Sequence, residues 1–209
     1  FGIEPNGNAP HDPQQEFTGK NILYVATDTG ALSAAAGRPT QDIQAVLQHA
    51  RLAMFEARLT RPRPHLDDKV LTAWNGLMIG AFARMARFVS GGGGIEAGLF
   101  LDAARRAATF VREHLWRSES GTLLRRYRRG QADVEAYAED FACLVHGLLE
   151  LFAADPDPAW LEWAVTLQDR QDAHFWDDQD AGWFSTSGRD PRVLLRMKET
   201  YDGAEPSAT

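Results

Sequence analysis

The sequence predicts a mostly α-helical fold built of αα-hairpins, with short β-hairpins inserted between them. Over several long segments, apolar residues recur at intervals of three and four, which is the spacing of amphipathic helices. The helical segments come in pairs, and turns rich in Gly or Pro separate their members. The second pair repeats the pattern of the first, which is typical of hairpin arrays.

The composition of the 209 residues is that of a globular protein, with 44% hydrophobic and 24% charged residues. No apolar run approaches the roughly 20 residues of a membrane span, and residues 1–10 do not resemble a signal peptide. We therefore expect a cytoplasmic protein with no membrane partner. The net charge of -7 opposes binding to phosphate backbones, so we expect no nucleic-acid partner.

The sequence offers no pattern that is typical of a metal or cofactor site. Its single cysteine, Cys143, allows neither an internal disulfide nor a cysteine-cluster metal centre. The glycines at 91–94 lack the preceding strand and the spacing of a nucleotide-binding loop. We expect no metal and no cofactor.

Residues 1–40 are predicted to be an extended segment that leads over the surface, because they are rich in Pro, Gly, Asn and Asp. A short strand is predicted at Asn21–Ala26. A helical domain is then expected over residues 41–209. It begins with an amphipathic helix at Gln41–Leu59, with Thr40 as N-cap, and the prolines at 62 and 64 end this helix.

Two helix pairs follow in the predicted domain. In each pair the first helix is apolar nearly all round and should be buried, whereas the second carries a polar stripe and should lie outside. The first helix of the first pair is expected to be capped by Asp67 or Asp68. This helix carries the apolar residues from Leu71 to Phe88 and should end near the glycines at 91–94. The other predicted helices span 97–116, 139–153 and 159–176, with a β-hairpin near Leu123–Arg128 between the pairs and a short strand at Trp183–Ser185 after them.

An internal repeat supports this arrangement. A shift of 67 residues places Gly80 on Gly147, and a shift of 60 places Trp116 on Trp176. The difference between the two shifts falls in the glycine loop, where insertions cost little. Because each hairpin returns the chain to the end where it began, the first helices of the pairs should run parallel and share one rim.

Three segments are expected at this rim, at residues 66–76, 137–141 and 198–206. The predicted catalytic residues there are the carboxylates Asp68, Asp140, Glu139 and Asp202, and the predicted substrate-binding residues are Asp67, Lys69, Trp74, Asn75, Tyr137, Glu199, Tyr201 and Glu205. Carboxylates, amides and aromatic rings in a concave site suit a sugar-like small molecule. Sugar hydrolysis needs two carboxyl groups, whereas epimerisation needs a proton shuttle beside a carbonyl.

Two alternatives remain open at the level of sequence. Each acidic residue sits where carboxylates cap helix N-termini, and Trp74 could belong to the core. The whole domain could also be a non-catalytic scaffold or binding module. The basic cluster of Arg125, Arg126, Arg128 and Arg129 is interpreted as a charged hairpin edge, with an anion-binding patch as the alternative.

Two stretches carry a family resemblance, RPHLDDKVLTAWNGLMI at 63–79 and KETYDGAEPS at 198–207. The chain resembles the thioredoxin-domain-containing spermatogenesis-associated family. This resemblance implies a thioredoxin-like domain with a cysteine pair, followed by an (α/α)6 toroid similar to N-acylglucosamine 2-epimerases and six-hairpin glycosidases. With a single cysteine, the chain is expected to lack the thioredoxin-like domain and to hold part of the toroid.

A partial toroid has a consequence for its partners. The outer flanks of its terminal hairpins would be apolar and exposed, and large apolar patches usually mark interaction sites. We therefore expect self-association, or contact with the remainder of the parent toroid.

Overall fold

The computed structural model describes residues 1–9, 11–90, 95–191, 193–203 and 206–208. The chain divides into two compact units, Phe1–Leu66 and Asp67–Thr209. Helices dominate the described residues, in agreement with the predicted fold class, and a small antiparallel sheet accompanies them. Within the described residues, no helix combines the length and the apolar character that a bilayer crossing demands.

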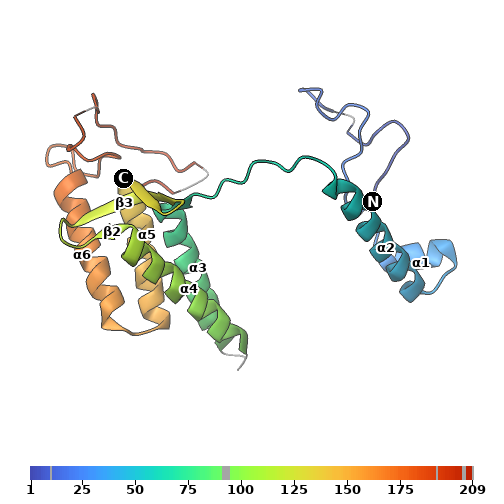
Figure 1. Cartoon of the computed structure of the whole chain (residues 1–209), viewed down its shortest axis with the longest axis horizontal. Helices are drawn as coiled ribbons and strands as arrows, with labels where there is room; N and C mark the ends of the chain where they lie inside the picture. Colours follow the sequence, from blue (N-terminus) through green and yellow to red (C-terminus); the bar gives the residue numbers. More distant parts are fainter. Residues whose placement is uncertain (10, 91–94, 192, 204–205, 209) are drawn as a thin grey trace. The chain divides into compact units, whose positions relative to one another are not determined.

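The N-terminal unit contains two helices, α1 at Thr29–Ala36 and α2 at Thr40–Leu59 (Figure 1). Helix α2 has nearly the predicted bounds, although Pro39 rather than Thr40 is its N-cap. Neither helix contains a buried residue. Because burial of apolar side chains is the main source of helix stability in proteins, this unit has little of its own to hold it together.

Two predictions for residues 1–40 are wrong in detail. Asn21–Ala26 forms no strand, because the segment has no partner strand to pair with. Helix α1 was not expected, because residues 1–40 were predicted to be an extended segment. Asp28 caps its start by accepting from the Ala31 N–H at 2.9 Å, and Gly37 ends it at a φ of 60°, in the left-handed region.

The C-terminal unit contains the two predicted helix pairs. Figure 1 shows them side by side, with the strands across one end. The first pair is α3 at Thr72–Ser90 and α4 at Ile95–His114, and the second is α5 at Ala138–Ala154 and α6 at Pro158–Phe175. Their buried side chains form one core, which includes Ile79, Ala108, Val111, Leu144, Leu148, Leu151, Trp163, Leu167 and Phe175.

Helices α3 and α5 run parallel, as the hairpin repeat predicted, and the structure adds that they touch backbone to backbone. A Cβ on Gly147 would lie 2.3 Å from the Gly76 carbonyl oxygen, and one on Gly80 would lie 3.5 Å from the Gly147 Cα. One turn further along, the Arg84 guanidinium donates to the Glu150 carboxylate at 2.8 Å. Glycine is needed at this crossing because any side chain would force the two helices apart.

The strands form a small antiparallel sheet around β3, Thr122–Arg128. On one side β3 pairs with β1, Val70–Leu71, and with β2, Trp116–Arg117. On the other side it pairs with β4, Gln131–Glu135. Strands β1 and β4 lead directly towards α3 and α5, so the sheet lies at the end where these two parallel helices begin.

This sheet corrects two predictions. Asp67 and Asp68 do not cap α3, because β1 intervenes between them and Thr72. The basic strand β3 is central in the sheet rather than an edge. The three arginines of β3 and the adjacent Arg129 are paired with carboxylates: Arg125 with Glu139 and Asp140, Arg126 with Asp133, and Arg128 and Arg129 with Asp68.

Helix α3 is less buried than predicted. The side chains of Trp74, Met78, Met85 and Phe88 recur along one face of the helix and are exposed, Phe88 by 82%. Their spacing of three, four and seven residues is that of a helix-packing stripe. Among its described residues, the C-terminal unit thus leaves one apolar face of α3 uncovered by its own elements.

Candidate functional site

Asp140 joins the starts of α3 and α5. Its side chain is fully buried. Oδ1 accepts from the Ala73 N–H at 3.1 Å, whereas Oδ2 accepts from the Tyr137 N–H and from Arg125 Nη1, both at 2.9 Å. One carboxylate therefore satisfies a first-turn N–H of α3 and the N-cap N–H of α5, which are otherwise left without partners at helix N-termini.

Burial raises the pKa of the Asp140 carboxyl to about 6, although its three donors favour the charged form. Two effects therefore oppose each other at this residue. Loss of solvent favours protonation, and the Arg125 guanidinium with the two backbone N–H groups favours the carboxylate. The sequence predicted a catalytic role for Asp140, but both of its oxygens are already occupied within the fold.

Arg125 links Asp140 to two further predicted site residues. Its Nη1 lies 2.5 Å from a carboxylate oxygen of Glu139, and its guanidinium stacks over the Tyr137 ring at 4.5 Å from the centroid. Tyr137 is the N-cap residue of α5, and Glu139 follows in the first turn. The ring and the carboxylate are thus held in fixed positions at the start of the helix, and both remain partly exposed.

The predicted residues of segment 66–76 lie partly before α3 and partly in its first turn. Asp67 pairs with Lys69 at 3.1 Å, and Asp68 bonds Arg128 near the turn that joins β3 to β4. The pKa of Asp68 is lowered by that hydrogen bond, although partial burial opposes the effect. Asn75 donates to the Leu71 carbonyl at 2.8 Å, and the Trp74 side chain is 53% exposed. These contacts give Asn75 a structural partner and leave the Trp74 ring on the surface.

The C-terminal segment folds back beside the start of α5. The Ala138 N–H donates to the Ser185 carbonyl at 3.1 Å, and the Ser185 N–H donates to the Met197 carbonyl at 2.7 Å. Lys198 anchors the segment through a 2.6 Å ion pair with Asp177. The backbone around Ser185 therefore lies between the start of α5 and the backbone around Met197.

Of the predicted residues in this segment, Glu199 reaches the predicted rim. It lines a hollow of about 90 Å³ together with Tyr137, Glu139, Ser185 and Ala208. Asp202 accepts from the Ser207 N–H at 2.8 Å, and the Tyr201 side chain is exposed. Glu205 lies outside the described residues.

A larger cleft adjoins this hollow at Tyr137. It has a volume of about 530 Å³, which falls within the range of small-molecule sites. One wall is the end of β4 and the connector to α5, from Val134 to Tyr137. The other wall is the C-terminal segment, which contributes Thr186, Ser187, Arg189, Asp190, Pro191 and Val193.

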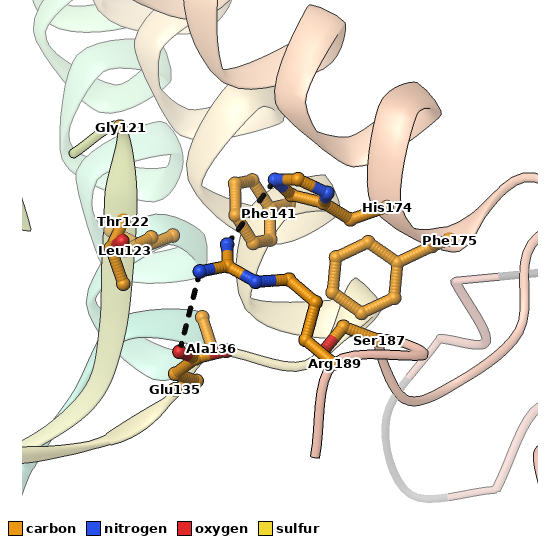
Figure 2. A pocket seen from close by; sticks show the side chains of 10 residues that line it. All are labelled: Gly121, Thr122, Leu123, Glu135, Ala136, Phe141, His174, Phe175, Ser187 and Arg189. Carbon is orange, nitrogen blue, oxygen red and sulfur yellow. Dashed lines mark hydrogen bonds and ion pairs between the residues drawn. The ribbon is translucent and has the colours of Figure 1, made fainter. Parts of the chain in front are cut away.

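Arg189 lies in a wall of the cleft, and its side chain also lines a smaller pocket together with Leu123, Phe141 and His174 (Figure 2). Its guanidinium lies 3.9 Å from a Glu135 oxygen and 3.5 Å from His174 Nε2. Figure 2 shows the side chain between these two residues, with the Phe141 and Phe175 rings beside it. Burial lowers the pKa of His174, and the charge of Arg189 lowers it further, so the imidazole is neutral near pH 7.

Val134 carries backbone strain at the rim of the cleft. Its φ is 62°, in the left-handed region, where a β-branched residue is a clear outlier. The ladder between β3 and β4 pairs Leu124 with Glu135 and Arg126 with Asp133, but the pair between them is absent from its register. Strain of this kind costs about 1–3 kcal/mol and clusters at functional sites.

Sequence reasoning missed this larger cleft. Arg189, Glu135 and Ser187 lie in segments that carried no recognisable motif, and the strained Val134 was invisible from its residue type. The one signal in the sequence was Arg189 itself, a basic residue that follows the predicted strand Trp183–Ser185. In the described ranges of the chain, no group of three or more His, Cys, Asp or Glu side chains is arranged to hold a metal ion.

Comparison with known proteins gives relatives over the whole chain. The chain is 36% identical to Spermatogenesis-associated protein 20 of Homo sapiens over 219 residues and 38% identical to that of Mus musculus over 220 residues. An uncharacterised protein of Caenorhabditis elegans is 30% identical over 219 residues. The predicted resemblance to spermatogenesis-associated proteins is therefore confirmed at the level of these relatives.

The chain spans 27% of the length of the human and mouse relatives and 29% of that of the nematode protein. No family model matches the chain. The names of these relatives state no substrate or reaction, so any activity must be argued from the site itself.

Proposed function

We propose that the C-terminal unit is part of an (α/α)6 toroid and binds a sugar-like small molecule at the start of α5. The observation that supports this proposal is the convergence of Tyr137, Glu139, Ser185 and Glu199 on one hollow that opens beside a ligand-sized cleft. Carboxylates and a hydroxyl provide hydrogen bonds for a polyol, and an aromatic ring provides a face for its C–H groups.

Within this site, Glu139 and Glu199 are the carboxylates best placed to act on a ligand. Hydrolysis of a glycosidic bond requires two carboxyl groups that flank it, one as acid and one as base or nucleophile. Asp140 is less suited, because its side chain is fully buried and does not line the hollow. The catalytic roles of Asp68 and Asp202 stay predictions, and we do not include them in this pair.

The first test of this proposal is whether the chain binds a sugar, and hydrolysis of a sugar is tested afterwards. Isothermal titration of the 209-residue chain with glucose, N-acetylglucosamine and maltose should show saturable binding of at least one of these sugars. Glu139→Gln and Tyr137→Phe are the site variants, and Glu162→Gln on the exposed face of α6 is the matched control.

The expected result is weaker binding in Glu139→Gln by about tenfold, since a charge-assisted hydrogen bond contributes about 1.5–3 kcal/mol. Tyr137→Phe should bind nearly as well as the original chain if the ring face is what contacts the sugar. Absence of binding for all sugars, or equal loss in Glu162→Gln, contradicts the proposal.

The uncovered face of α3 favours a second candidate function, that of a scaffold. Trp74, Met78, Met85 and Phe88 form an exposed apolar stripe, and such stripes usually pack against another surface. We therefore propose self-association through α3. Light scattering should give a mass above 23.2 kDa, and Phe88→Glu should restore the monomer mass. A monomer at all concentrations contradicts this second proposal.

A further inference from the structure

Arg189 differs from the other arginines that tie the C-terminal unit together. Arg105 bonds Asp155 with two contacts of 2.7 Å, and Arg126 bonds Asp133 at 2.7 and 2.9 Å. Arg189 has longer contacts, at 3.9 Å to Glu135 and 3.5 Å to His174. A guanidinium is normally satisfied by acceptors within about 3.2 Å, so this one is held loosely.

Arg189 is also accessible to a ligand, unlike an arginine buried in the core. It lines the 530 Å³ cleft, and 46% of its side chain is exposed. The Glu135 carboxylate is 50% exposed, so its pairing with Arg189 is screened by water and costs little to break. A ligand that brings a second anion to the guanidinium could therefore displace Glu135 at low cost.

Besides Arg189 and Glu135, the cleft is lined by hydroxyls, apolar side chains and one further carboxylate, that of Asp190. Ser187 and Thr186 carry hydroxyls, whereas Val134, Pro191 and Val193 present apolar surface on the walls. The strained backbone at Val134 turns an exposed β-branched side chain to the rim. Planar carboxylates and phosphates are the anions that a guanidinium binds with two parallel hydrogen bonds.

We propose that the cleft contains an anion subsite centred on Arg189, which binds a small molecule that carries a carboxylate or a phosphate group. The guanidinium leaves Glu135 and takes the ligand's anion, while the body of the ligand lies against Val134, Pro191 and Val193. This inference goes beyond the proposed sugar site, because it depends on Arg189 and not on Glu139 or Tyr137.

The test uses four small probes on the 209-residue chain, followed by NMR or isothermal titration. Benzoate and phenyl phosphate carry the two anions on the same ring, and benzamide is the neutral match. Glucose is the fourth probe and reports on the sugar site alone. We expect benzoate or phenyl phosphate to bind at least tenfold more tightly than benzamide, and the preferred anion identifies the ligand class.

Three variants separate a binding role from a structural one. Arg189→Gln should weaken anion binding at least tenfold, whereas Glu135→Gln should strengthen it several-fold, because the competing carboxylate is gone. Arg106→Gln, an exposed arginine on α4, should leave binding unchanged. An arginine with a purely structural role would not respond to Glu135→Gln in this direction.

The outcomes are distinct from those of the sugar proposal. Anion binding without binding of glucose, N-acetylglucosamine or maltose supports the subsite and contradicts the sugar site. Equal affinity for benzamide and both anions, unchanged anion binding in Arg189→Gln, or no binding of any anion overturns the subsite. Circular dichroism of Arg189→Gln confirms that the variant is folded before its affinity is interpreted.

Discussion

Replacement of Asp140 by asparagine tests whether this buried carboxylate organises the site. The change keeps the shape of the side chain and removes its charge and one acceptor. If the amide oxygen faces Tyr137 and Arg125, the amide nitrogen faces the Ala73 N–H, so two donors meet in a buried position. In the opposite orientation the amide nitrogen faces the Tyr137 N–H and the Arg125 guanidinium, so two donors lose their acceptor and the structure is destabilised further.

The magnitude follows from the better of these orientations. One hydrogen bond is lost, one buried N–H is left unsatisfied at a cost of about 1–3 kcal/mol, and the pairing with Arg125 loses its charge. We expect Asp140→Asn to lower the free energy of unfolding at pH 7 by about 2–4 kcal/mol. Asp140→Ala leaves all three donors unpaired and should cost about 3–5 kcal/mol.

The assay is urea unfolding followed by tryptophan fluorescence, with Asp133→Asn as the control. Asp133 also pairs with an arginine of β3, but its side chain is exposed and water screens the pair. A far smaller loss is therefore expected for the control. Equal stability of Asp140→Asn and Asp133→Asn would refute the role of Asp140 as the junction of the two helices.

Three further predictions concern stability and its dependence on pH. Gly147→Ala places a Cβ 2.3 Å from the backbone of α3 and should cost about 3 kcal/mol by thermal or urea unfolding, whereas Gly98→Ala on the open face of α4 should add up to about 1 kcal/mol. A loss in Gly98→Ala as large as that in Gly147→Ala would contradict the close crossing of α3 and α5. Val134→Asn should raise the free energy of unfolding by about 1 kcal/mol, because asparagine tolerates a positive φ, and Val165→Asn on α6 should change little. A destabilised Val134→Asn would show that the strain is absent in solution. Because the pKa of Asp140 is raised from 3.8 to about 6, the pH-dependent part of its contribution to stability is full below pH 3.8 and is lost as the pH rises through 6. The stability deficit of Asp140→Asn should therefore narrow between pH 4 and pH 7, and a deficit that widens over this range would contradict the raised pKa.

The helical architecture was predictable because it depends on local periodicity. The apolar spacing predicted the pairs of helices, and the return of the chain in each hairpin predicted that α3 and α5 run parallel. These signals are repeated in the sequence, so one weak position does not change the prediction. The short helix α1 was missed because its capping residues, Asp28 and Gly37, resemble those of a turn.

The features that depend on long-range pairing could not be predicted. Strand β1 has two residues, and it exists because β3, more than 50 residues later, supplies its partner. For the same reason Asp68 faces Arg128 instead of a helix N-terminus. Arg189 belongs to a segment without periodicity, and the fold alone places it beside Glu135 and His174.

The candidate site was predictable in part. Tyr137, Glu139 and Glu199 were expected at one rim and do share a hollow. Asp140 was expected there as well, but residue type could not show that its carboxylate is fully buried and hydrogen-bonded on both oxygens. Residue type identifies what a side chain can do, and only its partners decide what remains available.

The central claim is that the start of α5 and the C-terminal segment form a ligand-binding cleft. The most direct measurement is an NMR titration of the isotope-labelled 209-residue chain with maltose, N-acetylglucosamine and benzoate, with assigned backbone amides. Saturable shifts should concentrate at Tyr137, Ser185, Ser187 and Arg189. Shifts that gather on the exposed face of α3, or the absence of any saturable shift, would contradict the claim.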